Sequence, residues 1–424
     1  MSNEGEAMKK SKRALTPKLR FPEFRDSPGW KERPLSEVLS EHGLKSTGSE
    51  QVFSVSVHKG LVNQIKHLGR SFSASSTDHY NRVLPGDVVY TKSPTGNFPL
   101  GIVKQSKLEF PVIVSPLYGV FSPETTGLGV ILDAYFESPA NAKTFLDPLV
   151  QKGAKNTINI KNNRFLSGTL ILPVNKEEQC KIGDFLHSLD GLIAAEGRKL
   201  AALRDHKRGL MQQLFPQPGQ TQTQPRLRFP EFRGKGEWSE KTLGDICEVL
   251  MCKRIFASET SPNGEVPFYK IGTLGGVPDA FISKNLFEEY KLKYSFPRVG
   301  EVLITCSGTI GKCLPYDGSK AYFQDSNIVW IDNPTLEVSN EFLLSILSNV
   351  NWSRLNSTTI TRIYGPDLRG LPIKFPQNEK EQQRITDCLS ALDTRITAQT
   401  AKIETLKQHK RGLMQQLFPA PEER

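Results

Sequence analysis

Two long segments of this chain carry apolar residues at the spacing of helices that pack along a single seam. Isoleucine and leucine recur every three, four or seven residues between Pro173 and Leu214, and again between Pro376 and Leu417, which is a heptad pattern. Neither segment has a proline or a glycine-rich break after Glu177 or Lys380, so each predicts one helix of about 40 residues, ~60 Å long. The seam residues are Ile182, Leu186, Leu189, Ile193, Leu200 and Leu203, and Ile385, Leu389, Leu392, Ile396, Ile403 and Leu406.

The two segments end in the same phrase. The sequence HKRGLMQQLFP occupies His206–Pro216 and returns at His409–Pro419, and an identical repeat of this length indicates a chain of two halves. Polar residues interrupt both seams at matching places: Glu196, Gln399, Lys207 and Lys410. Because polar residues at core positions fix register and orientation at a cost in stability, we expect the helices to pair with each other as an antiparallel coiled coil. The alternative is two unrelated amphipathic helices on separate domains.

A second phrase opens each half. The sequence LRFPEFR stands at Leu19–Arg25 and at Leu227–Arg233, followed by Trp30 and Trp238 at matching positions. An aromatic arm of this kind is expected to pack against the rest of its half rather than to bind a ligand.

Between arm and helix, the two halves differ in sequence but agree in their order of features. Short apolar runs after turn residues predict strands, and longer periodic runs predict helices. The expected strands are Gln51–Val57, Leu84–Lys92 and Val112–Phe121 in the first half, and Val266–Ile271, Arg298–Thr305 and Ala321–Ile331 in the second. The expected helical stretches are Asn141–Gln151 and Glu341–Leu355, each followed by a polar segment, 152–171 or 356–374. Each half is therefore predicted to be an α+β module.

These features divide the chain into seven parts. A linker rich in Gln, Thr, Pro and Gly separates the halves. We expect a disordered tail (1–17), a first module (18–174), its helix (175–216), the linker (217–226), a second module (227–376), its helix (377–419) and a short tail (420–424). An antiparallel helix pair would place the two globular modules at opposite ends, related by a pseudo-twofold axis.

The amino-acid composition predicts the cellular compartment of the protein and the charge of its partner. The 424 residues are 37% hydrophobic and 24% charged, and no apolar run approaches the ~18 residues of a membrane span. The first residues lack the apolar core of a signal peptide, so a cytoplasmic protein with no membrane partner is expected. The six cysteines lack the close pairing of a zinc site and are expected to be free, mostly buried thiols. A net charge of +10 favours a polyanionic partner.

Catalytic signals are weak. There is no Asn-Pro-Pro-Tyr methylation motif and no glycine-rich loop for S-adenosylmethionine. Gly308–Cys313 resembles part of a phosphate-binding loop, but Cys306 and Cys313 stand where glycine and Ser or Thr are needed. The spacing of Asp279, Glu289 and Lys291 is compatible with a metal-dependent nuclease, although the first half has no counterpart. The nuclease and a coiled-coil scaffold without DNA remain alternatives, and no metal site is predicted.

The starts of the two long helices carry a family resemblance. They read EEQCKI at Glu177–Ile182 and KEQQRI at Lys380–Ile385, preceded by LPV and KFP. Together with the repeated helices and diverged modules, they resemble the specificity subunit of type I restriction-modification enzymes over nearly the whole chain. The resemblance implies a non-catalytic subunit that reads a bipartite sequence in double-stranded DNA, one half-site per target-recognition domain, with the gap set by the helix pair. It also implies two methyltransferase subunits and the restriction (motor-nuclease) subunits as partners, with S-adenosylmethionine, ATP and Mg²⁺ bound by those partners.

Candidate DNA contacts lie in the polar loops and segments of the modules. Base edges are read by Arg, Lys, Asn, Gln, Ser and Thr side chains, while phosphate contacts fix the register. The residues chosen on this basis are Lys92, Lys152, Lys155, Asn156 and Arg164 in the first module, and Thr309, Lys312, Arg354, Arg362 and Tyr364 in the second.

Overall fold

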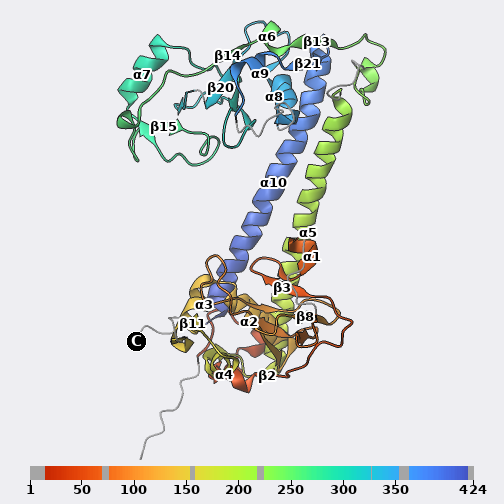
Figure 1. Ribbon diagram of the computed structural model, residues 1–424, viewed down its shortest axis with the longest axis vertical. Helices are drawn as coiled ribbons and strands as arrows, with labels where there is room; N and C mark the ends of the chain where they lie inside the picture. Colours follow the sequence, from red (N-terminus) through yellow and green to blue (C-terminus); the bar gives the residue numbers. More distant parts are fainter. Residues whose placement is uncertain are drawn as a thin grey trace, which may run out of the picture. The chain divides into compact units, whose positions relative to one another are not determined.

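The protein is described by a computed structural model that covers residues 15–68, 76–152, 158–216, 224–325, 327–352 and 362–418. The chain forms two compact units, one of Met1–Gly197 with Ala401–Arg424 and the other of Arg198–Thr400. Each unit combines one module with a piece of each long helix (Figure 1). None of the helices in the described ranges has both the length and the hydropathy of a membrane span.

The first module contains short strands and helices before its long helix. Its elements are η1 (Pro22–Phe24), β1 (Lys31–Pro34), η2 (Leu35–Glu37), β2 (Leu39–Glu41), β3 (Phe53–Ser56), β4 (Gly60–Asn63), α1 (Gln64–Leu68), β5 (Asn81–Val83), β6 (Val88–Tyr90), β7 (Val103–Gln105), β8 (Val112–Val114), β9 (Gly119–Pro123), α2 (Thr126–Phe136), α3 (Pro139–Leu146), η3 (Asp147–Leu149), β10 (Gln151–Lys152), β11 (Ile158–Asn159), α4 (Asn162–Ser167), β12 (Thr169–Leu172) and α5 (Lys176–Leu214).

The second module follows the same plan. Its elements are η5 (Pro230–Phe232), β13 (Ser239–Thr242), α6 (Leu243–Ile246), β14 (Glu248–Leu250), η6 (Ala257–Glu259), β15 (Val266–Tyr269), β16 (Phe281–Ile282), α7 (Lys284–Lys293), β17 (Val302–Thr305), β18 (Cys313–Pro315), β19 (Tyr322–Phe323), β20 (Ile328–Asp332), α8 (Asn340–Asn349), α9 (Gly365–Arg369), β21 (Pro372–Phe375) and α10 (Glu379–Leu417).

The central sheets of the two modules have the same topology. The strand order is β2-β9-β6-β7 in the first and β14-β20-β17-β18 in the second, and every neighbouring pair is antiparallel. In both modules a separate two-stranded sheet, β1 with β12 or β13 with β21, joins the start of the module to the strand before the long helix. The predicted fold class, a doubled α+β module with two long helices, is confirmed.

A shared turn sets the start of the central strand in each sheet. Gly86 and Gly300 have φ values of +84° and +89°, a region that side chains with a Cβ avoid. The next residues, Asp87 and Glu301, are both 2% exposed. Their carboxylates accept the backbone N–H of the first turn residue at 2.7 and 2.8 Å. The turns therefore position β6 and β17 in the same way despite different sequences.

The buried helix α2 was missed and one correspondence was wrong. The sequence paired the 141–151 stretch with the helix around Glu341, but α2 is the counterpart of α8. The N-cap side chain of α2, Thr125, donates to Gln179 Oε1 at 2.8 Å, and Gln382 Oε1 accepts the backbone N–H of Ser339, the N-cap of α8, at 2.8 Å. Because nearly all of α2 is buried, it has no polar face and no helical periodicity to reveal it.

The core of each unit includes the end of the other half's helix. In the first unit, Leu417 belongs to the same hydrophobic core as residues of β6, β9, α2 and α4. In the second, Met211, Leu214 and Phe215 pack with Trp238 and with residues of α8 and β21. All twelve predicted seam residues are buried or half-buried, and none is exposed.

Candidate nucleic-acid interface and helix pair

The long helices run in opposite directions within each unit. Each is 39 residues long, Lys176–Leu214 and Glu379–Leu417. In the first unit, Glu196 pairs with Lys402 at 2.5 Å and Asp190 with Lys410 at 2.6 Å, so α10 numbering falls as α5 numbering rises. In the second unit, the pair of Lys207 and Asp393 at 2.6 Å is the repeat-related equivalent of Lys410 and Asp190.

Lys410 has the more buried environment of these two seam lysines. Its ammonium lies 2.6 Å from Asp190 Oδ1 and 2.8 Å from Glu137 Oε2. Burial by itself lowers the pKa of Lys410, but the hydrogen bonds and charges of Asp190 and Glu137 raise it above its ordinary value. Burial raises the pKa of Asp190, and the stronger effect of Lys410 and Lys107 holds it below its ordinary value. The polar residue Lys410 in the seam is thus part of a network of oppositely charged side chains.

A repeated set of three residues, which we call the clasp, joins each aromatic arm to the start of a long helix. In the first unit Glu178 accepts two hydrogen bonds from Arg20, both at 2.7 Å, and one from Trp30 Nε1 at 3.1 Å. In the second unit Glu381 accepts from Arg228 at 2.7 and 2.8 Å and from Trp238 Nε1 at 3.2 Å.

The same arms also hold the end of the other helix. The backbone N–H of Leu19 donates to Gln416 O at 3.1 Å, and that of Leu227 donates to Gln213 O at 2.9 Å. The ring centroids of Trp30 and Phe418, and those of Trp238 and Phe215, are 6.3 Å apart in both units. The arms therefore pack within their units, as expected.

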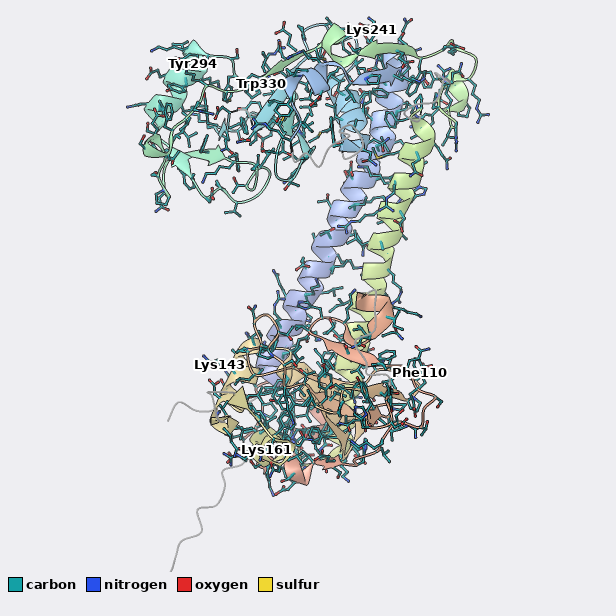
Figure 2. All side chains as sticks on the ribbon, in the orientation of Figure 1. Phe110, Lys143, Lys161, Lys241, Tyr294 and Trp330 are labelled. Atoms are coloured by element: carbon teal, nitrogen blue, oxygen red, sulfur yellow. The ribbon has the colours of Figure 1, made fainter. Side chains whose placement is uncertain are left out.

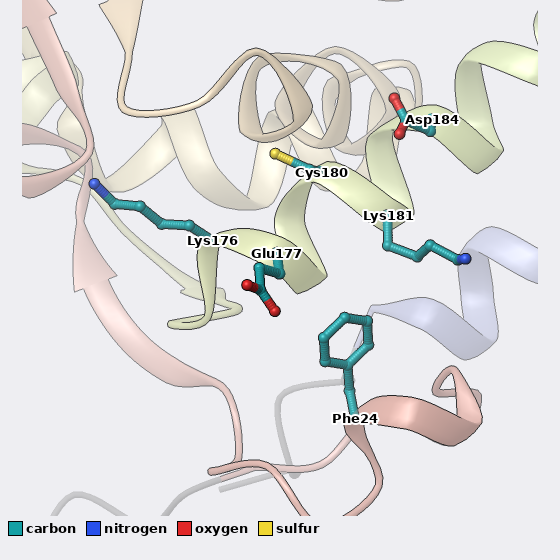
Figure 3. A pocket seen from close by; sticks show the side chains of 6 residues that line it. All are labelled: Phe24, Lys176, Glu177, Cys180, Lys181 and Asp184. Atoms are coloured by element: carbon teal, nitrogen blue, oxygen red, sulfur yellow. The ribbon is translucent and has the colours of Figure 1, made fainter.

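A hollow lies beside the first arm. Its volume is about 420 Å³, and it is lined by Phe24, Lys176, Glu177, Cys180, Lys181 and Asp184 (Figure 3). Cys180 is the exposed thiol, whereas Cys247, Cys252 and Cys306 are buried and Cys313 and Cys388 are half-buried. Burial raises the pKa of Cys306 to about 11 and that of Cys313 to about 12, which keeps both thiols protonated.

In the first module, the loop after β6 lies close to the start of α4. The ring of Tyr90 stacks on Phe165 with centroids 4.6 Å apart. Burial lowers the pKa of the half-buried Lys92, and the nearby carboxylate of Glu41 opposes this shift. Glu41 Oε1 also accepts a hydrogen bond from Asn162 Nδ2 at 2.6 Å. The predicted contacts Lys92 and Arg164 therefore lie on neighbouring segments, and Arg164 is exposed on α4.

In the second module, the corresponding loop is joined directly to the segment before α9. Ser307 and Arg362 form an antiparallel bridge, and the backbone N–H of Ile363 donates to Cys306 O at 2.7 Å. The structure thus brings together two segments, 307–312 and 362–364, that were chosen separately from the sequence.

Four predicted contacts lie on these joined segments. Thr309 and Lys312 are exposed, but the Lys312 ammonium donates to the carbonyl oxygen of Leu274. The Arg362 guanidinium lies 5.7 Å from the centre of the Tyr364 ring, and Tyr364 is 53% exposed. The guanidinium is planar by itself, and an attractive contact with an aromatic face favours one orientation of its donors, which suits it to contact a planar base or a phosphate.

The remaining predicted contacts fall at or beyond the edge of the described ranges. Lys155, Asn156 and Arg354 lie outside the described residues. Lys152 lies in β10, where its backbone pairs with Ile158.

Lys161 is a surface residue that the sequence reading missed. It occupies the N-cap position of α4, where its side chain makes no capping hydrogen bond, and it is exposed (Figure 2). Leu172 pairs with Lys31, and Phe375 pairs with Ser239, at the starts of the equivalent strands β1 and β13. Leu172 and Phe375 are therefore counterparts. Lys161 and Tyr364 precede them by the same number of residues, so they are counterparts too. The signal was present in the sequence, because both segments run without a gap into the repeated helices.

The alternative nuclease residues have separate partners. Asp279 pairs with Lys270 at 3.1 Å, and Glu289 pairs with Lys293 at 2.8 Å. The Lys291 ammonium lies over the rings of Phe287 and Phe296, at 5.6 and 5.3 Å. Within the described part of the chain, no group of three or more His, Cys, Asp or Glu side chains is placed to hold a metal ion.

Comparison with known proteins agrees with this architecture. Residues 235–408 match the family model described as the type I restriction modification DNA specificity domain. A stretch of 152 residues is 48% identical to a protein of Haemophilus influenzae named as a type I restriction enzyme specificity subunit. The match covers 36% of this chain, and the chain spans 39% of the length of that relative.

Two solved structures have a similar fold. The crystal structure of a type I restriction-modification S subunit from M. genitalium gives a TM-score of 0.57 at 13% identity, covering 96% of this chain and 100% of that one. A second structure, described as the structural basis of complex assembly and conformational transition of the type I R-M system, gives a TM-score of 0.53 at 15% identity. The match covers 93% of this chain and 98% of that one. Residues 235–408 therefore match the type I restriction modification DNA specificity domain, in agreement with the family resemblance suggested by the repeated phrases.

Proposed function

We propose that the chain is the DNA-reading specificity subunit of a type I restriction-modification complex, with each module reading one half of a bipartite site. The observation that carries this proposal is the use of one module frame twice with different side chains at equivalent places. Lys92 and Cys306 follow equivalent strands, and Lys161 and Tyr364 precede equivalent helices. Two readers with one frame and different contacts suit two different half-sites.

The helix pair is proposed to set the gap and to dock the partner subunits. Two copies of one partner subunit need two equivalent surfaces on this chain, and the repeated phrase supplies them. His206 and His409, and Arg208 and Arg411, are exposed on the two helix ends. Two methyltransferase subunits would occupy these equivalent surfaces, with the restriction subunits joining for cleavage. The chemistry, with S-adenosylmethionine, ATP and Mg²⁺, is assigned to those partners.

The test is to map methylated sites made by the complex of this chain with its methyltransferase subunit, using long-read sequencing. Exchanging residues 26–170 for those of a relative should change one half-site and leave the other half-site and the gap as they were. Methylated sites without two separated halves would contradict the proposal.

A second arm tests the nuclease alternative on the chain alone. The purified chain should neither methylate nor cut DNA. Magnesium-dependent cutting that is lost in Asp279→Ala and kept in Asp317→Ala, an exposed carboxylate of the same module, would replace the proposal with a nuclease.

A further inference from the structure

The loop after the central strand is closed by the same threonine latch in both modules. Thr91 N donates to Ile102 O at 2.9 Å, and Ile102 N donates back to Thr91 Oγ1 at 3.2 Å. Thr305 N donates to Lys312 O at 3.1 Å, and Lys312 N donates to Thr305 Oγ1 at 3.0 Å. The two threonines are 3% and 0% exposed, so each is buried and fully committed to closing its loop.

A glycine completes each latch. Gly101 has a φ of +103°, and a Cβ there would lie 1.8 Å from Thr91 O. Gly311 has a φ of +74°, and a Cβ there would lie 1.9 Å from the ring of Trp352. Only glycine fits either place. The two loops are therefore built alike although they differ in length.

The latches present a shared pattern of hydroxyl residues. The sequences are TKSPT at 91–95 and TCSGT at 305–309. The last threonine of each, Thr95 and Thr309, is exposed. The fold makes little use of the Thr95 and Thr309 hydroxyls. Thr95 Oγ1 donates only a long hydrogen bond, 3.4 Å, to Ser93 O. At Thr309, the backbone carbonyl and not the side chain accepts the hydrogen bond from the Thr305 hydroxyl. Between the threonines of each pattern, Ser93 and Ser307 also match, whereas Pro94 stands against Gly308 and Lys92 against the buried Cys306.

DNA offers one surface that is the same at both half-sites. Contacts that read bases must differ between two readers of different sequences, whereas the sugar-phosphate backbone is uniform. A side chain that is identical and exposed at the same distance from the latch threonine in both readers suits the uniform surface. We propose that the Thr95 and Thr309 hydroxyls donate equivalent hydrogen bonds to backbone phosphates of the two half-sites.

This assignment rests on the proposed function and is tested on the assembled complex. Thr95→Val and Thr309→Val keep the shape of the side chain and remove the hydroxyl. Each should weaken binding roughly 3- to 10-fold, on cognate DNA and on DNA with either half-site scrambled. The slope of log affinity against log salt should not change, because no cation is removed. The methylated sequence should be that of the wild type.

Three further variants serve as controls. Thr95→Ser and Thr309→Ser restore the hydroxyl and should restore affinity, which separates its loss from a loss of folding. Arg362→Met removes a charge and should lower the salt slope. A Val variant that changes the methylated bases of one half-site, or that binds every DNA as tightly as the wild type, overturns the assignment alone. A wild-type complex that shows no preference for a bipartite site overturns the proposed function and this assignment with it.

Discussion

At the scale of single residues, the clasp depends on carboxylates that are almost wholly removed from water. Glu178 and Glu381 are 1% and 0% exposed, and each is held by one arginine and one tryptophan N–H. A buried charge that keeps its partners is tolerated, whereas one that loses its partner destabilises the fold strongly. The arginine of each arm is therefore required by the glutamate beneath it.

Arg20→Met should lower the free energy of unfolding of the first unit by about 3–5 kcal/mol, because it leaves the Glu178 carboxylate buried without its cation. Arg25→Met is the matched control in the same arm, since Arg25 is exposed, and it should change stability by less than about 0.5 kcal/mol. Urea unfolding followed by circular dichroism measures both. Equal effects of the two substitutions would show that the clasp does not hold the arm.

At the scale of elements, close approach of two helices depends on glycine. A Cβ on Gly183 of α5 would lie 2.5 Å from Gly127 Cα of α2, whereas a Cβ on Gly191, farther along α5, would meet nothing within 4 Å. One glycine is therefore needed for packing, and the other only weakens its helix.

Gly183→Ala should destabilise the first unit by about 1–3 kcal/mol, because the added methyl group forces α2 and α5 apart. Gly191→Ala, in contrast, should stabilise it by about 0.5–1 kcal/mol through helix propensity. Thermal unfolding of the two variants tests the opposite signs. A shift of the same sign and size in both would mean that the helices do not pack through Gly127.

The seam lysines provide a second comparison between elements. Lys410→Met should cost about 1–3 kcal/mol, because it leaves Asp190 and Glu137 without a shared cation. Lys207→Met should cost less, since Lys207 is 24% exposed and its partner Asp393 is 55% exposed. Denaturant titrations of both variants test this order. A larger loss of stability in Lys207→Met than in Lys410→Met would contradict it.

The extra cost in Lys410→Met should depend on pH. The pKa of Asp190 is below its ordinary value of 3.8, so its share of stability is present above that pH and lost as the pH falls through the lowered pKa. The pKa of Lys410 is above its ordinary value of 10.5, so its share is complete below that pH and lost as the pH rises through the raised pKa. The difference from the wild type should therefore be flat at neutral pH and shrink at both extremes. A stability difference between Lys410→Met and the wild type that changes steadily across neutral pH would show that a group other than Asp190 or Lys410 is responsible.

At the scale of the whole molecule, each unit contains the start of one long helix and the end of the other. A change in helix length must therefore be made in both helices to preserve both clasps. Gly197 and Thr400 end the two stretches where the chain passes between units, and they occupy equivalent places in the repeat.

Inserting one heptad after Gly197 and one after Thr400 should keep the seam in register and lengthen each helix by ~10 Å. The recognised half-sites should keep their bases, and the gap should grow by about three base pairs at ~3.4 Å each. Mapping of methylated sites tests this. Inserting two residues at each place is the control, because it turns the seam away from its partner and should abolish assembly. Altered bases at an unaltered gap would contradict the proposed role of the helices.

The sequence predicted the features that repeat and missed those that depend on burial or long-range pairing. Both long helices and the central strands were found because their apolar spacing is visible locally. The helix α2 was missed because burial on all sides removes that spacing. The contact between Cys306 and Ile363 was beyond reach, since it joins strands and loops far apart in the chain. The pairing of Arg20 with Glu178 did leave a signal, because the arm and the helix start are repeated together.

The reciprocal exchange of helix ends has a consequence for synthesis on the ribosome. Leu417 belongs to the core of the first module, yet it is translated about 240 residues after the start of that module's own α5 at Lys176, a delay on the order of tens of seconds at about 5–20 residues per second. During that interval the apolar residues of the first module that share a core with Leu417 lack this partner. The first module to be made is thus the last to receive its complete core.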